Sequence, residues 1–389
     1  MELNFKHTAC LAVSALVIAT TGAQAAQDKE PIVIGAAISL TTEQAIAGQE
    51  QRAGILTAVN EINQAGGVPG KGGNRPVEII FADNGNSPTK AVNALEEVLS
   101  KHPVAVMLSI RGTHVLPQLP LLAREKVPGL TISATNALTK QGNHYIFRYY
   151  PNDAVTKPIL TKYVTEKLKL TRPAIFYSSE DYGSSGRDAF LASLKAAGIE
   201  PVAVESHKPT DKDFTAQLLK FKSQHADVIY MQTQEAASAL ILKQAKRLQL
   251  GIPFAVAVTS VGASALELVK PDEIAGTYAE AAVVDPNSSK DPAVKKWAAA
   301  VQDALKITPD YAAEINYDAT KMLLKAIELY GPDSAAIDKG LHEMSYKGLI
   351  STYRADKEGN MNHAASVIKI TADKHQEEVF RSEVDFTPY

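Results

Sequence analysis

The sequence predicts an α/β protein of two similar lobes, each with a parallel central sheet, joined by a hinge of several strands. Two observations predict this fold class. Short β-branched runs alternate with longer amphipathic runs, which is typical of strand–helix–strand units around parallel sheets. The chain of 389 residues also exceeds the roughly 250–300 residues at which a single hydrophobic core stops growing, so we expect it to divide.

The first 26 residues are expected to form a signal peptide that directs the chain to the periplasm. Lys6 precedes an apolar run over 9–19, and residues 23–25 read Ala-Gln-Ala, the small-x-small pattern of a cleavage site. A buried N-terminal helix is the alternative, but a polar stretch interrupts its pattern. The single cysteine, Cys10, lies inside the apolar run, so neither disulfides nor a lipid anchor are expected in the mature chain.

The first group of elements is expected to begin with a strand over 31–38. A helix should follow, because apolar residues recur at helical spacing until Gly66 and Gly67 end the pattern. Ser87 can cap the next helix, with Pro88 at its first position. The other predicted elements of this group are strands over 77–82, 104–108 and 127–132 and helices over 88–100 and 119–124.

A second group repeats the rhythm after a crossover at 148–153, where Pro151 and a helix-capping residue interrupt the pattern. Gly198 and Gly251 are expected to end two of its helices. Its predicted elements are helices over 154–169, 185–197, 213–224 and 236–250 and strands over 174–177, 201–205, 227–231 and 254–258.

The C-terminal third has too few elements for a third lobe, so it is expected to complete both earlier sheets. It is predicted to contain strands near 277–284, 349–354 and 367–371 and helices over 293–305 and 312–330. The expected division is therefore 27–148 plus 277–348 for lobe 1 and 149–276 plus 349–389 for lobe 2. Such a chain crosses between the lobes more than once.

The ligand-contacting residues are expected in loops that follow the strands. Open parallel sheets bind ligands in the crevice beyond the carboxyl ends of their strands. The loops selected by this rule are 109–113, 133–136, 178–183, 232–235 and 259–262.

Five segments carry a resemblance to a known family. They read IVIGAAISLTTEQAIAGQEQRAGILTAVNEINQAGGVPG, VPGLTISATNALT, YIFRYYPND, IFYSSEDYGSSGRDAF and IPFAVAV. In this order and spacing they resemble the periplasmic receptors of branched-chain amino-acid ABC transporters, over essentially the whole mature chain. The resemblance implies the type I periplasmic-binding-protein fold with two Rossmann-like lobes. It also implies a monomer without a cofactor that binds a small ligand and delivers it to an inner-membrane permease.

In the first lobe, the resemblance implies that hydroxyl and backbone N–H groups hold a ligand carboxylate. Thr113, Ser133 and Thr135 fall at the corresponding positions, and small hydroxyl residues donate hydrogen bonds without filling the cleft. A role in capping or turns is the alternative for Thr113 and Thr135. Arg111 departs from the small or apolar residue of the family, and it either grips a carboxylate through two parallel hydrogen bonds or is a solvated surface residue.

In the second lobe, Tyr182 falls where the family closes an aromatic ring over the ligand; simple packing under the next helix is the alternative. Relatives place an acidic residue after the strand equivalent to 254–258, where it meets a ligand ammonium, but this chain has Val261 nearby. Glu235, Glu180 or Asp181 can replace that acid or serve as helix caps, and a carboxylic acid without an amine stays open. The predicted site is Arg111, Gly112, Thr113, Ser133, Ala134, Thr135, Tyr182, Gln234, Glu235 and Val261.

An enzyme and a ligand-sensing regulator of the same fold are the alternative functions. The first strand is not followed by a glycine-rich dinucleotide turn, and the segment 66–73 lacks the spacing of a phosphate loop. Nine histidines show no zinc-ligand spacing, and no G-x-S-x-G elbow surrounds the loop serines. The net charge of −3 gives no field for nucleic acid or for a membrane surface. The leader argues against a cytoplasmic regulator.

Overall fold

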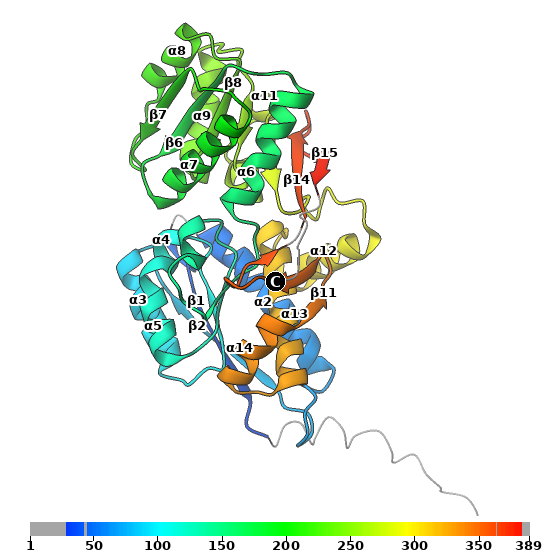
Figure 1. Cartoon of the computed structure of the whole chain (residues 1–389). Coiled ribbons are helices and arrows are strands. Elements are labelled where there is room, and N and C mark those ends of the chain that lie inside the picture. The colour runs from blue at the N-terminus through cyan, green and yellow to red at the C-terminus, as the bar shows by residue number, and fades with distance from the viewer. Residues whose placement is uncertain (1–28, 43–44, 363, 383–389) are drawn as a thin grey trace, which may run out of the picture.

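Two separate sheets organise the chain into two α/β lobes (Figure 1). The computed structural model describes residues 29–42, 45–362 and 364–382, and the predicted signal peptide over 1–26 lies outside these residues. None of the described helices combines the length and the apolar character that a bilayer span requires. The predicted fold class, two lobes with parallel central sheets, is confirmed.

The sheet of lobe 1 consists of five parallel strands in the order β2-β1-β3-β4-β5. Helices cover both of its faces, so β1 is buried along most of its length and reads as a nearly continuous apolar run. The strands are β1 (Ile32–Ile38), β2 (Val77–Asp83), β3 (Val106–Leu108), β4 (Gly129–Thr131) and β5 (Ile146–Arg148).

The helices of lobe 1 come from two distant parts of the sequence. Ser87 accepts a hydrogen bond from the N–H of Lys90, and Pro88 opens the helix, so the predicted start of α3 is confirmed. One face of the sheet packs on α3 (Pro88–Leu99) and α5 (Leu119–Glu125). The other packs on α2 (Ala45–Gln64) and the C-terminal α13 (Tyr311–Tyr330). The remaining helices are α4 (Gly112–Val115), α12 (Pro292–Leu305) and α14 (Ser334–Glu343).

The sheet of lobe 2 has seven strands in the order β15-β14-β10-β9-β8-β6-β7. The five strands β6 to β10 run parallel, and β14 pairs antiparallel with both β10 and β15. The strands are β6 (Pro173–Ser178), β7 (Ala203–His207), β8 (Val228–Gln232), β9 (Phe254–Val256), β10 (Tyr278–Ala281), β14 (Ala365–Ile370) and β15 (Gln376–Ser382). The helices are α6 (Asp153–Lys162), α7 (Asp181–Ala196), α8 (Thr215–Ser223), α9 (Glu235–Arg247), α10 (Ala263–Glu267) and α11 (Pro271–Ile274).

Two segments lie in the opposite lobe from the expected division. The strand expected over 277–284 for lobe 1 is β10, which pairs with β9 and β14 in the sheet of lobe 2. The segment after 349, expected in lobe 2, instead forms β12 (Thr352–Ala355) between β11 (Ser345–Lys347) and β13 (Met361–Asn362). Asp318 of α13 holds that segment on lobe 1, because it accepts hydrogen bonds from the N–H groups of Leu349 and Ile350.

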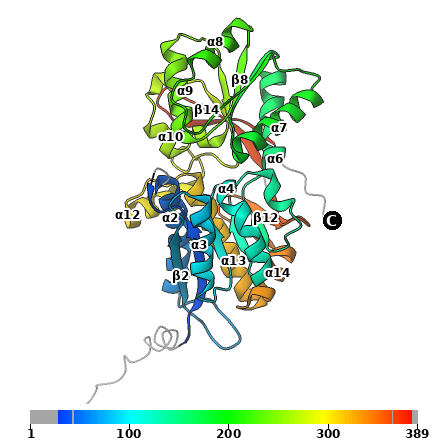
Figure 2. The same ribbon diagram turned by 90° about the vertical axis from the view of Figure 1, so that its left-hand side faces the viewer.

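The chain passes between the lobes at three places: between β5 and α6, between β10 and α12, and between β13 and β14. The side view shows the two lobes stacked on either side of this connection (Figure 2). The buried Arg148 ties the first passage to the third, since its Nε donates to Oδ1 of Asn360 at 3.0 Å and its Nη1 donates to the carbonyl of Thr135 at 2.6 Å. Buried hydrogen bonds of Arg148 therefore join two of the three passages of the predicted multi-strand hinge.

Candidate ligand-binding cleft

A pocket lies between the lobes, beyond the carboxyl ends of the strands of both sheets. Each of the five loops selected from the sequence contributes at least one residue to it. The lining residues are Ile110, Arg111, Gly112, Thr113, Ile132, Ala134, Tyr150, Tyr182, Gln234, Glu235, Val258, Thr259 and Tyr311.

One ion pair crosses the cleft. Arg111, just before α4 in lobe 1, places its Nη2 3.5 Å from Oε2 of Glu235, the first residue of α9 in lobe 2, and each side chain is 12% exposed. Among the described residues, neither Nε of Arg111 nor Oε2 of Glu235 has a hydrogen-bond partner. Burial and the charge of Arg111 lower the pKa of the neighbouring His114 to about 4, which leaves this histidine neutral near pH 7. The pocket thus presents one cation and one anion with unused bonding capacity.

Three tyrosines form much of the remaining surface. The hydroxyl of Thr259 donates a hydrogen bond to the carbonyl of Thr233 at 2.8 Å. Its oxygen therefore accepts a hydrogen bond from the Tyr182 hydroxyl, 3.1 Å away. Tyr150 and Tyr311 meet edge to face with ring centroids 6.1 Å apart. Burial raises the pKa of all three phenols well above the usual value, so all three are neutral rings that offer apolar surface.

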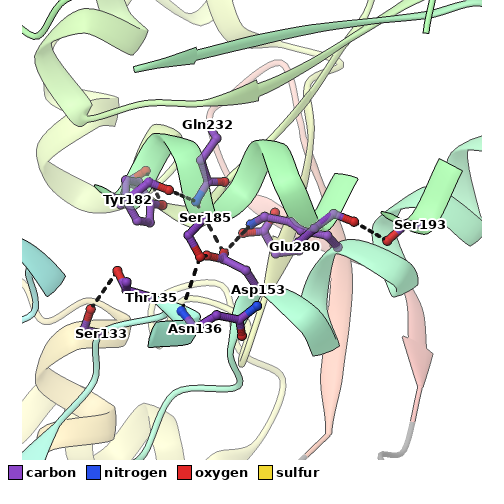
Figure 3. A network of polar contacts seen from close by, with 12 residues as sticks. Ser133, Thr135, Asn136, Asp153, Tyr182, Ser185, Ser193, Gln232 and Glu280 are labelled. Carbon is purple, nitrogen blue, oxygen red and sulfur yellow. Dashed lines mark hydrogen bonds and ion pairs between the residues drawn. The ribbon is translucent and has the colours of Figure 1, made fainter. Parts of the chain in front are cut away.

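A polar network lies behind Tyr182 (Figure 3). Oδ2 of Asp153, at the start of α6, accepts a hydrogen bond from Oγ of Ser185 at 2.6 Å. The same hydroxyl oxygen accepts from the N–H of Asn136 in lobe 1 at 3.3 Å, and the N–H of Asp153 donates to the carbonyl of Ala134 at 3.2 Å. These bonds connect the two lobes beside the cleft.

The same network contains three buried charged groups. Nζ of Lys157 lies 3.2 Å from Oδ1 of Asp153 and 2.5 Å from Oε1 of Glu280 on β10. Burial alone lowers the pKa of Lys157, but the two carboxylates outweigh this effect and raise the pKa. Burial raises the pKa of Glu280 to about 7 although Lys157 opposes it. Removing one member would leave a buried charge uncompensated, so the three side chains of α6 and β10 depend on one another.

Seven of the ten predicted site residues line the pocket, and three do not. Thr135 is buried, and its side chain fills the space beside Gly112, where a Cβ would lie 2.2 Å from Oγ1 of Thr135. Ser133 is buried within 3.5 Å of that hydroxyl. Val261 is fully buried, and its carbonyl accepts from Nε2 of Gln376 at 3.1 Å.

Of the acids considered from the sequence, Glu235 is the one that lines the pocket. Glu180 instead accepts a hydrogen bond from Nε2 of Gln234 at 2.9 Å, which positions that lining residue. Asp181, in the first turn of α7, is exposed.

Sequence reasoning missed two aromatic contributors, Tyr150 and Tyr311. Tyr150 follows β5, a strand that the sequence did not predict, and lies in the expected crossover over 148–153, so the rule about strand ends does not select it. Tyr311 is the first residue of α13, and Asp310 caps this helix by accepting from the N–H of Ala312 at 2.8 Å. The cap predicts a helix start at Tyr311, but not that this start faces the cleft.

Comparisons with known proteins agree with this architecture. The family model described as periplasmic binding protein matches residues 31–376. Leu/Ile/Val-binding protein homolog 3 of Brucella melitensis is 29% identical over 85% of this chain and 88% of its own length. Leu/Ile/Val-binding protein BraC3 of Rhizobium johnstonii is 31% identical over 80% of this chain and 83% of its own.

Solved structures with the same fold include two with different ligands. The branched-chain amino acid transporter substrate-binding protein LivJ from Streptococcus pneumoniae, in complex with isoleucine, has a TM-score of 0.81 at 22% identity, covering 91% of this chain and 99% of its own. A solute-binding protein of an ABC transporter from R. palustris, in complex with benzoate, has a TM-score of 0.81 at 15% identity, covering 92% and 98%.

Proposed function

The chain belongs to the periplasmic binding protein family, and from this membership we propose that it is the solute-binding component of an ABC importer, with a small carboxylate-bearing ligand held between its lobes. The family is one of binding proteins rather than enzymes, and its solved relatives carry isoleucine or benzoate. The pocket is lined from both lobes, as capture by hinged closure requires. The segment 1–26 serves as the leader to the periplasm, where the monomer meets its permease.

The ion pair between Arg111 and Glu235 is the observation that favours an α-amino acid. One carbon separates the carboxylate and the ammonium of an α-amino acid, so the two groups fit side chains that lie 3.5 Å apart on opposite lobes. A zwitterion that lies beside the pair adds a charge-assisted contact to each of the two side chains. A ligand with a carboxylate alone pairs with Arg111 and leaves Glu235 buried without a cation, which is unfavourable.

The rest of the lining favours an apolar ligand side chain. Ile110, Ile132 and Val258 supply aliphatic surface, and the three tyrosines supply aromatic surface. Pockets lined in this way gain affinity from apolar burial, while a few polar groups set the orientation. We assign the ligand carboxylate to Arg111 and to the neighbouring N–H groups of Gly112 and Thr113, and the ammonium to Glu235. Tyr182, Ala134 and Gln234 contact the remainder.

An aromatic carboxylic acid is the second candidate. The three neutral tyrosine rings give it an aromatic environment, and a relative of the same fold carries benzoate. The two ligand classes differ in their use of Glu235, because an aromatic acid without an amine has no cation for that carboxylate.

Glu235→Gln separates the candidates. The substitution removes the partner of an ammonium, so we expect it to weaken binding of L-leucine and L-phenylalanine about 10- to 100-fold. Benzoate should bind the variant at least as well as the wild type, because no buried acid is then left unpaired. Calorimetry on refolded, ligand-free protein measures both effects, with Glu205→Gln, a partly buried ion-pair acid of lobe 2 that does not line the pocket, as the control. Wild-type protein that binds benzoate but no amino acid contradicts the α-amino acid assignment.

A further inference from the structure

A second group of ligating side chains lies at the amino-end edge of the lobe 1 sheet. His144 precedes β5, whereas the cleft lies beyond the carboxyl ends of the same parallel strands. Asp338 and His342 are one turn apart on α14, which Figure 1 shows at the end of lobe 1 away from lobe 2. The group is therefore separate from the ligand-binding cleft.

The spacing of the donor atoms suits a tetrahedral metal. Nε2 of His144 lies 2.9 Å from Oδ2 of Asp338, and Nε2 of His342 lies 3.8 Å from Oδ1 of the same residue. One ligand atom from each residue falls within 4.8 Å of the other two. Ligands about 2.0–2.1 Å from a tetrahedral zinc ion are about 3.3 Å apart, so small side-chain rotations bring all three atoms to a common ion.

The surroundings leave bonding capacity unused at this point. Oδ1 of Asp338 is buried and has no hydrogen-bond partner among the described residues. The rings of His144 and His342 stack with centroids 4.1 Å apart, an arrangement that disfavours two charged imidazoles. His144 is 59% exposed, which gives an ion a path from solvent.

We propose that His144, Asp338 and His342 form a binding site for a divalent transition-metal cation, with Zn²⁺ as the best match and water as the fourth ligand. Two imidazoles and one carboxylate are ligands that zinc prefers, whereas Mg²⁺ and Ca²⁺ prefer oxygen ligands alone. Nε2 of His342 donates to the carbonyl of His144 at 3.2 Å, so in the neutral imidazole this proton would move to Nδ1 for Nε2 to bind the metal. The bound ion joins the last turn of α14 to the segment that leads into β5.

The sequence alone did not suggest this site. Asp338 and His342 have the i,i+4 spacing that puts two ligands on one helix face, but His144 lies almost two hundred residues earlier. Its approach to α14 is a property of the fold.

The test is calorimetric titration of Zn²⁺ into full-length, tag-free protein that has been treated with a chelator. We expect one ion per chain, and at least a tenfold weaker binding in each of His144→Gln, Asp338→Asn and His342→Gln, since even indirect partners of a metal ligand contribute about 10- to 100-fold. His375→Gln is the control, because this exposed histidine lies 3.7 Å from Asp373 and is not part of the proposed metal site. Titration with Mg²⁺ should give no comparable signal.

A second readout depends on stability rather than on heat. A metal that binds only the folded chain raises the melting temperature, and the rise should be present in wild type and His375→Gln and absent in His144→Gln. His144 is the most exposed of the three proposed ligands, so its variant should fold. Circular dichroism checks the fold of all four variants, the control included. A wild-type protein that binds no Zn²⁺, or three variants that bind it like the wild type, overturns the proposal. Neither result bears on the cleft, since its ligands are tested by a separate titration.

Discussion

We propose that Arg111 and Glu235, one on each lobe, act together as a single recognition element. Neither belongs to a motif that specifies a charge at its position. Their value comes from burial: with side chains 12% exposed, their interaction is screened less by water than that of a surface pair. A ligand that satisfies both groups therefore binds only when both lobes are in place.

Replacing Arg111 tests the carboxylate half of this element. Arg111→Gln should weaken binding of an apolar α-amino acid about 10- to 100-fold, because charge-assisted hydrogen bonds to the carboxylate are lost. Arg111→Lys should fall between this variant and the wild type, since the charge stays but the two parallel bonds do not. Calorimetry is the measurement, with the exposed Arg124→Gln as the control. Equal affinities in all four proteins would show that the carboxylate is held elsewhere.

Individual site residues were predictable from sequence wherever a strand end was recognised. Arg111, Tyr182 and Glu235, chosen from the loops after β3, β6 and β8, lie at the pocket, and their contact with a ligand stays a prediction. Thr135 shows the limit of this reasoning, because a hydroxyl after a strand can turn inward, and here it fills the space beside Gly112. Tyr311 could not be predicted from the sequence, because its contact with the cleft depends on how α13 packs across lobe 1.

The contact between α2 and α13 shows how elements far apart in sequence complete one lobe. Gly54 of α2 lies against the backbone of α13, and a Cβ added there would lie 2.0 Å from the carbonyl oxygen of Ala313. The absence of a side chain allows the two helices to approach closely. The apolar periodicity of both helices predicts that each is half-buried, but not that they bury each other.

Gly54→Ala should destabilise the protein by about 1–3 kcal/mol, because the added methyl group forces the helices apart. In a helix interior alanine is more stabilising than glycine, so any loss of stability in Gly54→Ala must come from this crowding. Urea unfolding measures the effect, and Gly72→Ala, where a Cβ would contact nothing within 4 Å, is the control. A Gly54→Ala variant as stable as the wild type would contradict the close approach.

Two buried acids at the ends of the same helices make stability depend on pH. Oε2 of Glu50 accepts from the N–H of Asp310 at 3.1 Å. Burial, with the charge of Asp310, raises the pKa of Glu50 to about 9, and burial, with the charge of Asp285, raises that of Asp310 to about 7. Between about pH 4 and pH 9 the folded chain therefore holds more protons than the unfolded chain, whose carboxyls titrate near 4. Stability should fall as the pH rises through this window.

Glu50→Gln keeps the hydrogen-bond acceptor and removes one ionisation. The loss of unfolding free energy between pH 6 and pH 9 should be smaller in this variant by on the order of 2 kcal/mol. Urea unfolding at the two pH values is the measurement, and the exposed Glu61→Gln on the same helix should behave like the wild type. An unchanged pH dependence in Glu50→Gln would assign the effect to other groups.

At the scale of the whole molecule, the connection between the lobes determines how the two halves of the pocket meet. Three passages of chain form the hinge, and Arg148 fastens two of them together. The alternation of strand and helix predicted two lobes, but the lobe to which β10 and β12 belong could not be predicted, because an apolar strand pattern shows burial and not which sheet covers it. The contacts of Asn136 with Ser185 and of Arg111 with Glu235 hold the lobes together beside the pocket. A ligand that adds contacts there favours this closed arrangement over an open one.

Small-angle X-ray scattering tests the central claim that the two lobes close on a ligand held between them. Refolded, ligand-free protein is measured alone, with each of the protein amino acids at saturating concentration, and with benzoate. The account predicts that at least one apolar α-amino acid lowers the radius of gyration of the wild type. Glu235→Gln should show no such compaction at a concentration of that ligand that saturates the wild type but lies below the dissociation constant of the variant. Dimensions that stay the same with every ligand, while calorimetry shows binding, would contradict capture by closure of the cleft.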